Sequence, residues 1–181
     1  MNKDHSISTL PTAHTAITQQ LTDGYVAVAE NKSLELKVLN PLILTFGLPA
    51  YANIGDAGLD LRACIAEPCV ILPKTIGIFK TGIAVSICDP TIVGIVAGRS
   101  GLYFKEQIRV GNGIGVIDSS YQGEICVALH NDGDKEYTVH PGERIAQFIL
   151  MPVYLRSFVM VDEFTSTSVR GSNGLGSSGK Q

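Results

Sequence analysis

The sequence contains no apolar run approaching the roughly 18 residues that a membrane-spanning helix needs, and its N-terminus lacks the apolar segment of a signal peptide. Its four cysteines, Cys64, Cys69, Cys88 and Cys126, match no zinc-binding or redox spacing, and each lies in or beside an apolar stretch. We expect buried free thiols in a reducing compartment rather than disulfides. These absences together predict a cytoplasmic protein that has no contact with a membrane.

Charge is also scarce, because charged residues make up 17% of the chain and the net charge is −3. This balance gives no basis for a large nucleic-acid interface, although a few arginines in one cleft would still bind a small anion. Tandem repeats and heptads are absent. A chain of 181 residues is long enough for one domain with a core and too short for two ordinary ones.

The residues that are abundant favour strands, since β-branched Ile and Val outnumber Leu and there are 19 glycines for tight turns. Short apolar runs separated by turn residues predict an all-β protein, an antiparallel sandwich or barrel. One short helix is expected over residues 101–107. The predicted strands cover residues 59–62, 69–72, 76–79, 83–87, 92–96, 108–110, 124–129, 137–139, 145–153 and 158–161.

Composition divides the chain into three parts. Residues 1–34, rich in Thr, Ser, Ala and Gln, are expected to be an extension of unknown role. Residues 35–164 form the predicted β-domain. Residues 165–181 consist mostly of Ser, Thr, Gly and Asn, and this composition predicts a flexible C-terminal arm.

The turn at residues 98–101 joins a predicted strand to the predicted helix, and backbone N–H groups at a helix start favour anions. Arg99 adds a forked cation and Ser100 a hydroxyl donor, and Gly101 ends the turn. The pattern is that of a phosphate-binding turn. A plain strand-to-helix turn with an N-capping serine explains these residues equally well.

A glycine-rich stretch at residues 111–118 ends at Asp118 and carries three glycines in five positions, which allow another molecule to approach the backbone closely. Asn112 offers both a donor and an acceptor to a flat polar edge. An ordinary hairpin with an aspartate at its turn is the alternative. Downstream, Gln147 in an apolar strand either faces solvent or points into a site, and Arg170 lies in a tail that resembles an anion-binding strap or serves no role.

Five segments in this order closely resemble the motifs of the trimeric dUTPase family, and the likeness runs from about Leu36 to the C-terminus. They read AGLDLRA at 57–63, GRSGL at 98–102, GNGIGVIDSSYQG at 111–123, GERIAQ at 142–147 and RGSNGLGSSG at 170–179. The resemblance implies a jelly-roll-type β-barrel. It also implies a homotrimer with shared sites and Mg²⁺-dependent hydrolysis of dUTP to dUMP and pyrophosphate.

The resemblance also implies roles for particular residues. Asn112 and the backbone near Val116, Ile117 and Cys126 would bind uracil. Asp118 would align or deprotonate the attacking water, and Tyr121 would pack against the deoxyribose and exclude a 2′-hydroxyl.

The resemblance implies that Arg99, Ser100 and Gly101 bind the phosphates, with Gln147 close by. It also implies that the C-terminal tail closes over the γ-phosphate through Arg170. The metal would be held by phosphates and waters, so no protein ligand is assigned to it.

Other readings remain open. A dCTP deaminase of related fold would carry glutamate where this chain has Gln122, and a neutral amide cannot shuttle a proton. A dUTPase-like regulator that binds nucleotide without hydrolysis is a second alternative, and the presence of Asp118 argues against it. A purely structural jelly-roll protein is the third.

The tail departs from the family pattern at two positions, since Leu175 stands where a phenylalanine usually stacks on uracil and Asn173 where glycine is usual. Gly98, where proline is frequent, should only loosen the turn before Arg99. Leucine covers a base by apolar contact without ring stacking. We therefore expect a weaker lid and a raised KM, without loss of the chemistry.

The Leu175→Phe substitution is expected to lower the KM for dUTP, because it restores an aromatic ring above the base. Steady-state kinetics and direct nucleotide binding measure the change. Unchanged binding and turnover would show that residue 175 does not cover the base.

Overall fold

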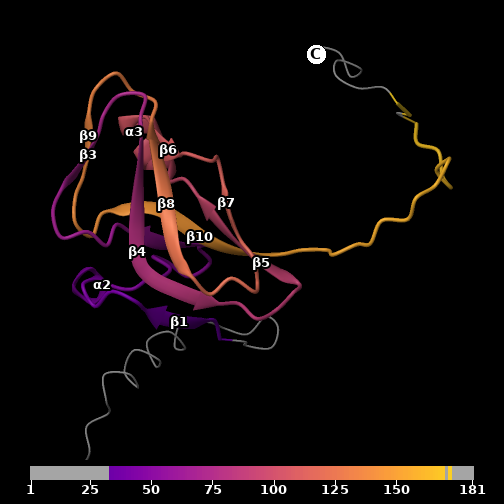
Figure 1. The fold of residues 1–181 in the computed structure, drawn as a ribbon, viewed down its shortest axis with the longest axis horizontal. Helices are drawn as coiled ribbons and strands as arrows, with labels where there is room; N and C mark the ends of the chain where they lie inside the picture. Colours follow the sequence, from indigo (N-terminus) through magenta and orange to yellow (C-terminus); the bar gives the residue numbers. More distant parts are fainter. Residues whose placement is uncertain (1–32, 170, 173–181) are drawn as a thin grey trace, which may run out of the picture.

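The structure is a computed structural model of the chain that describes residues 33–169, 171 and 172. Three antiparallel sheets make up the body (Figure 1). Two of them have four strands, in the orders β1-β4-β8-β6 and β2-β10-β5-β7, and the third pairs β3 with β9. The strands are β1 Glu35–Val38, β2 Gly58–Arg62, β3 Cys69–Ile71, β4 Ile76–Ser86, β5 Ile92–Ala97, β6 Ile108–Val110, β7 Gly115–Ile117, β8 Glu124–Asn131, β9 Tyr137–Val139 and β10 Arg144–Pro152.

Both four-stranded sheets contribute to one hydrophobic core. Along β8, Ile125, Val127 and Leu129 are buried while the residues between them face outward, which is the period of two expected for a strand with one buried face. Phe148 of β10 and Phe79 of β4 fill the core from the two sheets. The predicted all-β, jelly-roll-type architecture is confirmed, although the ladders of the described residues do not close into a single barrel.

The helix predicted over residues 101–107 is present as α3, Ser100–Glu106, and ends at Gln107 in a left-handed conformation. The prediction of one helix was wrong, because Ile43–Phe46 forms a further single turn, α2. Its residues are strand-type, and the turn is held by tertiary burial of Ile43, which is 1% exposed, and by a hydrogen bond from Leu42 N to Asn40 Oδ1 (3.0 Å).

Most predicted strands are confirmed, with two corrections. Residues 76–79 and 83–87, predicted as separate strands, fall except for Ile87 in the single strand β4, which ends at Ser86. Its register with β8 shifts between Lys80 and Ala84. Gly82 lies at this β-bulge with a φ of 73°, and its N–H donates to Glu124 Oε1 (3.0 Å). The β-bulge therefore explains why one continuous strand was predicted as two.

The strand predicted at residues 158–161 was wrong. Phe158 and Met160 are fully exposed, and the chain from Val153 onward runs away from the body (Figure 1). An apolar stretch forms a strand only when a neighbouring strand accepts its hydrogen bonds, and this segment has no such neighbour among the described residues of its own chain.

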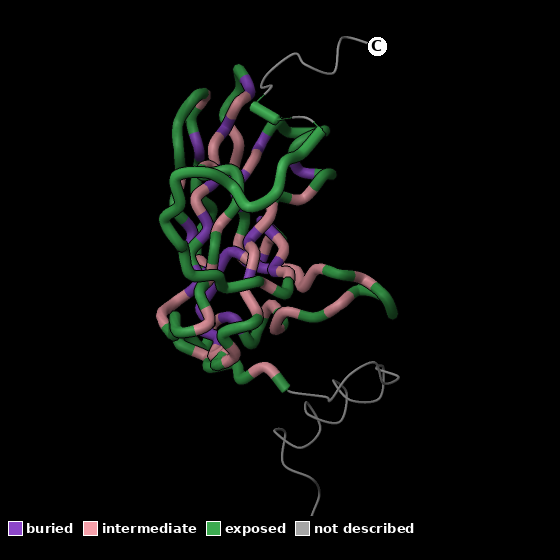
Figure 2. Tube along the Cα trace, turned by 90° about the vertical axis from the view of Figure 1, so that its right-hand side faces the viewer, coloured by how far each residue is buried: buried purple, intermediate pink, exposed green. Residues whose placement is uncertain are grey.

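The cysteine prediction is partly correct. All four thiols are free, as expected, but only Cys64 is buried, while Cys69, Cys88 and Cys126 are exposed (burial along the chain is shown in Figure 2). The three exposed cysteines follow from strand alternation and loop position, which apolar neighbours in the sequence do not reveal.

Neither α2 nor α3 has the length and apolar content that a membrane crossing requires, and the described residues contain no other α-helix.

Gly94 of β5 lies against Phe148, and a Cβ at this position would stand 2.4 Å from Phe148 Cε2. We expect Gly94→Ala to destabilise the fold by about 1–3 kcal/mol through overpacking. Gly98→Ala is the matched control, because its Cβ would meet nothing closer than 3.9 Å. Urea unfolding of both variants measures the difference, and equal midpoints would contradict the predicted clash.

Candidate active site

The junction between β5 and α3 places Arg99 at the beginning of the helix. Arg99 is extended, with φ −98° and ψ 128°, and its carbonyl accepts hydrogen bonds from Leu102 N (3.1 Å) and Tyr103 N (3.2 Å). Arg99 therefore occupies the N-cap position and makes no side-chain capping bond. The alternative of an N-capping serine at Ser100 was wrong, and the guanidinium of Arg99 is directed elsewhere.

Asp60 of β2 fixes that guanidinium. Its Oδ1 lies 2.9 Å from Arg99 Nε, and its Oδ2 lies 3.0 Å from Nη1 of Arg144 at the start of β10. Arg99 Nη1 also donates to the Arg144 carbonyl (3.2 Å). One carboxylate thus holds two arginines side by side, and their donors converge at one end of the sheet.

Gln147 completes this group. It lies opposite Asp60 on one side and Ala97 on the other in the β2-β10-β5 ladder, and its Nε2 donates to the Gly98 carbonyl (2.9 Å). Its side chain lies directly over Gly58, where a Cβ would come within 2.5 Å of Gln147 Oε1. The sequence left open whether Gln147 faces solvent or a site, and the structure places it at a cavity.

This cavity, the arginine cavity, has a volume of about 360 Å³. It brings together four residues predicted to bind phosphate, namely Arg99, Ser100, Gly101 and Gln147. The full lining is Ala52, Asp56, Ala57, Gly58, Asp60, Arg99, Ser100, Gly101, Arg144 and Gln147.

A second polar region lies on residues 108–117, which comprise β6, a turn and β7 and are called the glycine hairpin below. The expected pairing of its two strands was wrong, because β6 pairs with β8 and β7 with β5, so the turn joins two different sheets. Asn112 lies in the turn, where Gly113 has a φ of 78° and donates to the Val110 carbonyl (3.0 Å). On β7, Val116 is 58% exposed and its neighbour Ile117 is partly buried against the core. The backbone of the hairpin is therefore accessible, as the three glycines predicted.

Asp118 follows β7 and begins a tight turn, since its carbonyl accepts from Tyr121 N (3.0 Å). The Tyr121 hydroxyl donates to the Glu124 carbonyl (2.9 Å), so the ring folds back over Gly123. A Cβ at residue 123 would lie 2.5 Å from that hydroxyl. The glycine is thus what allows the tyrosine ring to take this position.

Cys126 lies on the outer face of β8, opposite Lys80 of β4. Partial burial raises the pKa of its thiol, and the charge of Glu124 raises it further, while Lys80 acts in the opposite direction. Cys126 lies on β8, the strand whose Ala128 carbonyl accepts a hydrogen bond from Gly111 N of the glycine hairpin (2.7 Å).

A single chain does not bring the two polar regions together. Ile117 lies opposite Gly94 in the ladder of β5 with β7, so Asp118 lies at the level of Val93. Arg99 lies six residues further along the same extended segment. At about 3.3 Å per residue, Asp118 and Arg99 are about 20 Å apart along the strand.

Sequence reasoning assigned no role to Asp60 or Arg144, although both lie within segments that carried the family resemblance. The available signal was their charge at alternate positions of otherwise apolar strands, which places them on the face opposite the core. Arg170, which we predicted to close over the phosphates, lies outside the described residues, as do Asn173 and Leu175.

Comparison with known proteins places this geometry in a family. The family model described as dUTPase matches residues 45–179. The chain belongs to the dUTPase family. It is 47% identical over 148 residues to deoxyuridine 5′-triphosphate nucleotidohydrolase of Legionella pneumophila (strain Paris), covering 81% of this chain and 97% of the relative. The enzyme of the same name from Cronobacter sakazakii is 42% identical over 151 residues, covering 83% and 99%.

A solved dUTPase has the same architecture. The dUTPase of Staphylococcus bacteriophage 80alpha, in a structure with dUPNHPP, superposes with a TM-score of 0.73 at 30% identity, covering 82% of this chain and 99% of the phage chain. The recognition of a dUTPase-family sequence and the expected fold are therefore confirmed.

Gly58→Ala tests whether Gln147 contributes to the arginine cavity of this dUTPase-family chain. The added Cβ displaces the end of a flexible side chain, so we expect little change in stability but weaker binding of the analogue dUpNHpp. Because a hydrogen bond to a charged group contributes about 1.5–3 kcal/mol, the dissociation constant should rise by roughly tenfold or more.

The control is Gly58→Ala in a Gln147→Ala background, where no amide remains to displace. Calorimetric titration of the two single variants and the double variant measures the coupling. Additive effects would mean that Gly58 acts independently of Gln147.

Proposed function

We propose that this chain hydrolyses dUTP to dUMP and pyrophosphate, limiting incorporation of uracil into DNA and supplying dUMP for thymidylate synthesis. The observation that carries the proposal is the arginine cavity beside α3, combined with an accessible glycine hairpin that Asp118 directly follows, in a chain of the dUTPase family. A triphosphate needs its charge neutralised before water attacks phosphorus, and converging arginines supply part of that neutralisation.

At the phosphate end, Arg99, Ser100 and Gly101 bind the triphosphate, with Gln147 beside them. Asp60 engages Arg99 Nε and the Arg144 carbonyl accepts from its Nη1, so the guanidinium is held in place where Arg99 lines the cavity. Arg170 in the tail contributes a further cation that closes over the terminal phosphate.

At the base end, Asn112 and the backbone near Val116, Ile117 and Cys126 bind the uracil edge. A hairpin that presents its own backbone groups discriminates uracil from cytosine, because an exchanged donor or acceptor is left unpaired at a cost of about 1–3 kcal/mol.

Next to the base, Tyr121 packs against the deoxyribose. Its ring is fixed by the hydroxyl contact with the Glu124 carbonyl, so it cannot move aside for a 2′-hydroxyl without losing that bond. Asp118 aligns the attacking water and accepts its proton, acting as the catalytic general base.

We further propose a homotrimer in which each active site combines residues of different chains. The separation of about 20 Å along β5 between Asp118 and Arg99 supports this, because both residues are proposed to act on the triphosphate, which is shorter than that distance. The exposed apolar segment around Phe158 and Met160 supports it as well, since contact with another chain would remove it from water.

Mg²⁺ is the proposed cofactor. The family resemblance implies that phosphates and waters hold the ion, so no protein ligand is assigned to it. When bound, the ion would supply positive charge to the phosphates. Arg99 and Gln147 would then orient the phosphates that carry it.

A dCTP deaminase remains the second candidate of the same fold. Its glutamate position is held by Gln122, whose Nε2 donates to Ser86 Oγ (3.1 Å), and this amide cannot transfer the proton that deamination requires. Pyrophosphate and ammonia release from dUTP, dCTP, dTTP and UTP, with and without Mg²⁺, distinguishes the two activities. A regulator that binds nucleotide without hydrolysis would release neither.

The four free thiols support a cytoplasmic location, because a reducing compartment preserves such thiols.

Asp118→Asn is expected to retain binding of dUTP while abolishing most turnover, because the amide keeps the shape of the side chain and cannot accept a proton. Pyrophosphate release and direct binding give the two readouts. A substantially active variant would remove Asp118 from the role of base.

Mixing two inactive variants tests the shared site. Arg99→Gln and Asp118→Asn chains, denatured together and refolded in equal amounts, should regain activity, since about a quarter of the sites in randomly mixed trimers combine native Arg99 of one chain with native Asp118 of another. Each variant refolded alone is the control. No regain of activity would place both residues in a site formed within one chain.

A further inference from the structure

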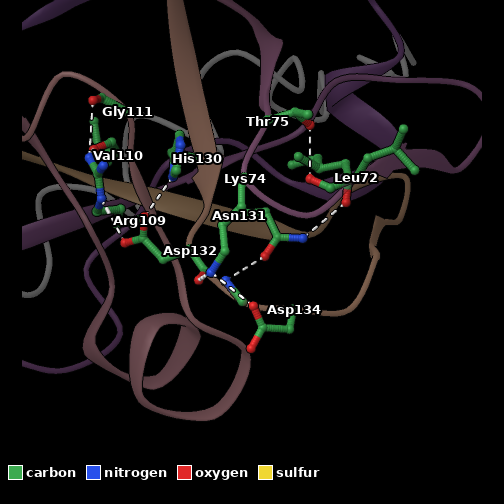
Figure 3. Close-up of polar contacts among 12 residues, drawn as sticks. Leu72, Lys74, Thr75, Arg109, Val110, Gly111, His130, Asn131, Asp132 and Asp134 are labelled. Carbon is green, nitrogen blue, oxygen red and sulfur yellow. Dashed lines mark hydrogen bonds and ion pairs between the residues drawn. The ribbon is translucent and has the colours of Figure 1, made fainter.

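A polar cluster outside the residues assigned above surrounds the turn at residues 131–135, here called the Asn131 turn (Figure 3). Asn131 is fully buried, and its Nδ2 donates to the carbonyls of Ile71 (3.1 Å) and Lys135 (2.7 Å). Its Oδ1 accepts from Gly133 N (2.9 Å), so every polar atom of the side chain is used. Such a buried, satisfied amide fixes the turn in one conformation.

The turn is also fixed through its backbone. Asn131 N donates to the Thr75 carbonyl (3.0 Å), and Lys74 N donates to the Asn131 carbonyl (2.8 Å). Asp132 N donates to the carbonyl of Gln107 at the end of α3 (2.9 Å). The Asn131 turn is therefore a rigid support between the β3–β4 connection and α3.

From this support the Asp132 carboxylate reaches Arg109 on β6. Its Oδ2 lies 2.8 Å from Arg109 Nε, and its Oδ1 lies 2.7 Å from His130 Nδ1, a close contact without hydrogen-bond alignment. Desolvation alone would raise the pKa of Asp132, but Arg109 and His130 together hold the pKa below its usual value. Asp132 therefore remains an anion that holds Arg109 in place.

Arg109 also donates to backbone carbonyls of the glycine hairpin through Nη1. Its Nη1 donates to the carbonyl of Gly111 (3.1 Å) and, at 3.3 Å, to that of Val110 (Figure 3). The Val110 carbonyl also accepts from Gly113 N, which closes the turn that carries Asn112. Arg109 thus links the rigid Asn131 turn to the first residues of the glycine-rich turn.

The link through Arg109 restricts a turn that its glycines would otherwise leave flexible. Gly111, Gly113 and Gly115 give the turn large conformational freedom, and ordering it only when the base binds would cost free energy. A loop that is ordered beforehand avoids that cost and gains affinity. Arg109 provides this order without contacting the nucleotide itself.

We propose that Arg109, held by Asp132, is a positioning residue that fixes the glycine hairpin for recognition of the base. The proposal rests on the proposed function, which places uracil at this hairpin. Arg109 thereby acts on base binding and discrimination, while the arginine cavity and Asp118 keep their roles in phosphate binding and chemistry.

The test compares Arg109→Gln with Asp134→Asn in the full chain. Asp134 belongs to the same turn but is exposed and pairs with Lys74, so it controls for a loss of charge at this location. We expect Arg109→Gln to raise the KM for dUTP about tenfold and to reduce discrimination against dCTP by a similar factor, since it removes one preorganising group. The value of kcat and the affinity for pyrophosphate should change less than twofold, and Asp134→Asn should match the native chain.

Asp132→Asn is the second variant, and it keeps the size of the side chain if Arg109→Gln fails to fold. It should reproduce the rise in KM. The double variant, Arg109→Gln with Asp132→Asn, should raise the KM little beyond either single variant, because both substitutions remove the same link. An unchanged KM and unchanged discrimination in both single variants would overturn the proposal, as would a loss confined to kcat.

Amide hydrogen exchange separates this proposal from the proposed function, because it needs no substrate. The amides of Gly113 and Ile114 should exchange several-fold faster in Arg109→Gln and Asp132→Asn than in Asp134→Asn. A native chain that fails to hydrolyse dUTP would refute the proposed function while faster exchange still supported the positioning link. Unchanged exchange in an active enzyme would refute the link alone.

Discussion

The ladder that β5 forms with β7 on one side and β10 on the other sets the positions of both polar regions. Near the end of β5, pairing with β10 places Gln147 next to Gly98, and the chain continues from Gly98 into Arg99. Near the start of β5, pairing with β7 places Asp118 at the level of Val93. Because an extended strand does not shorten, this strand fixes the distance between Arg99, proposed to bind phosphate, and Asp118, proposed to activate water. The proposed sharing of sites between chains follows from that distance.

Each polar region is held by a carboxylate that does not itself need to touch the nucleotide. Asp60 holds Arg99 and Arg144 at the cavity, and Asp132 holds Arg109 at the glycine hairpin. In both cases a forked guanidinium donates to the carboxylate and to backbone carbonyls at once. A lysine has no such planar fork, so arginine at these positions has a geometric as well as an electrostatic basis.

Local sequence was sufficient for the strands with strong alternation, for α3 and for the turn at Arg99, because these depend on residues close in the chain. It failed for α2, where the single helical turn depends on burial of Ile43 against other elements. It failed again at residues 158–161, which have strand-type residues but no partner strand among the described residues of the same chain. The contacts of Asp60 and Arg109 could not be predicted from local sequence for the same reason, since both depend on pairings with distant strands and turns.

The raised pKa of Cys126 has a chemical consequence for the outer face of β8. Partial desolvation and the nearby carboxylate of Glu124 shift this exposed thiol away from the thiolate, which is the form that oxidants attack. Cys126 is therefore less readily converted to sulfenic acid than an exposed cysteine without such neighbours.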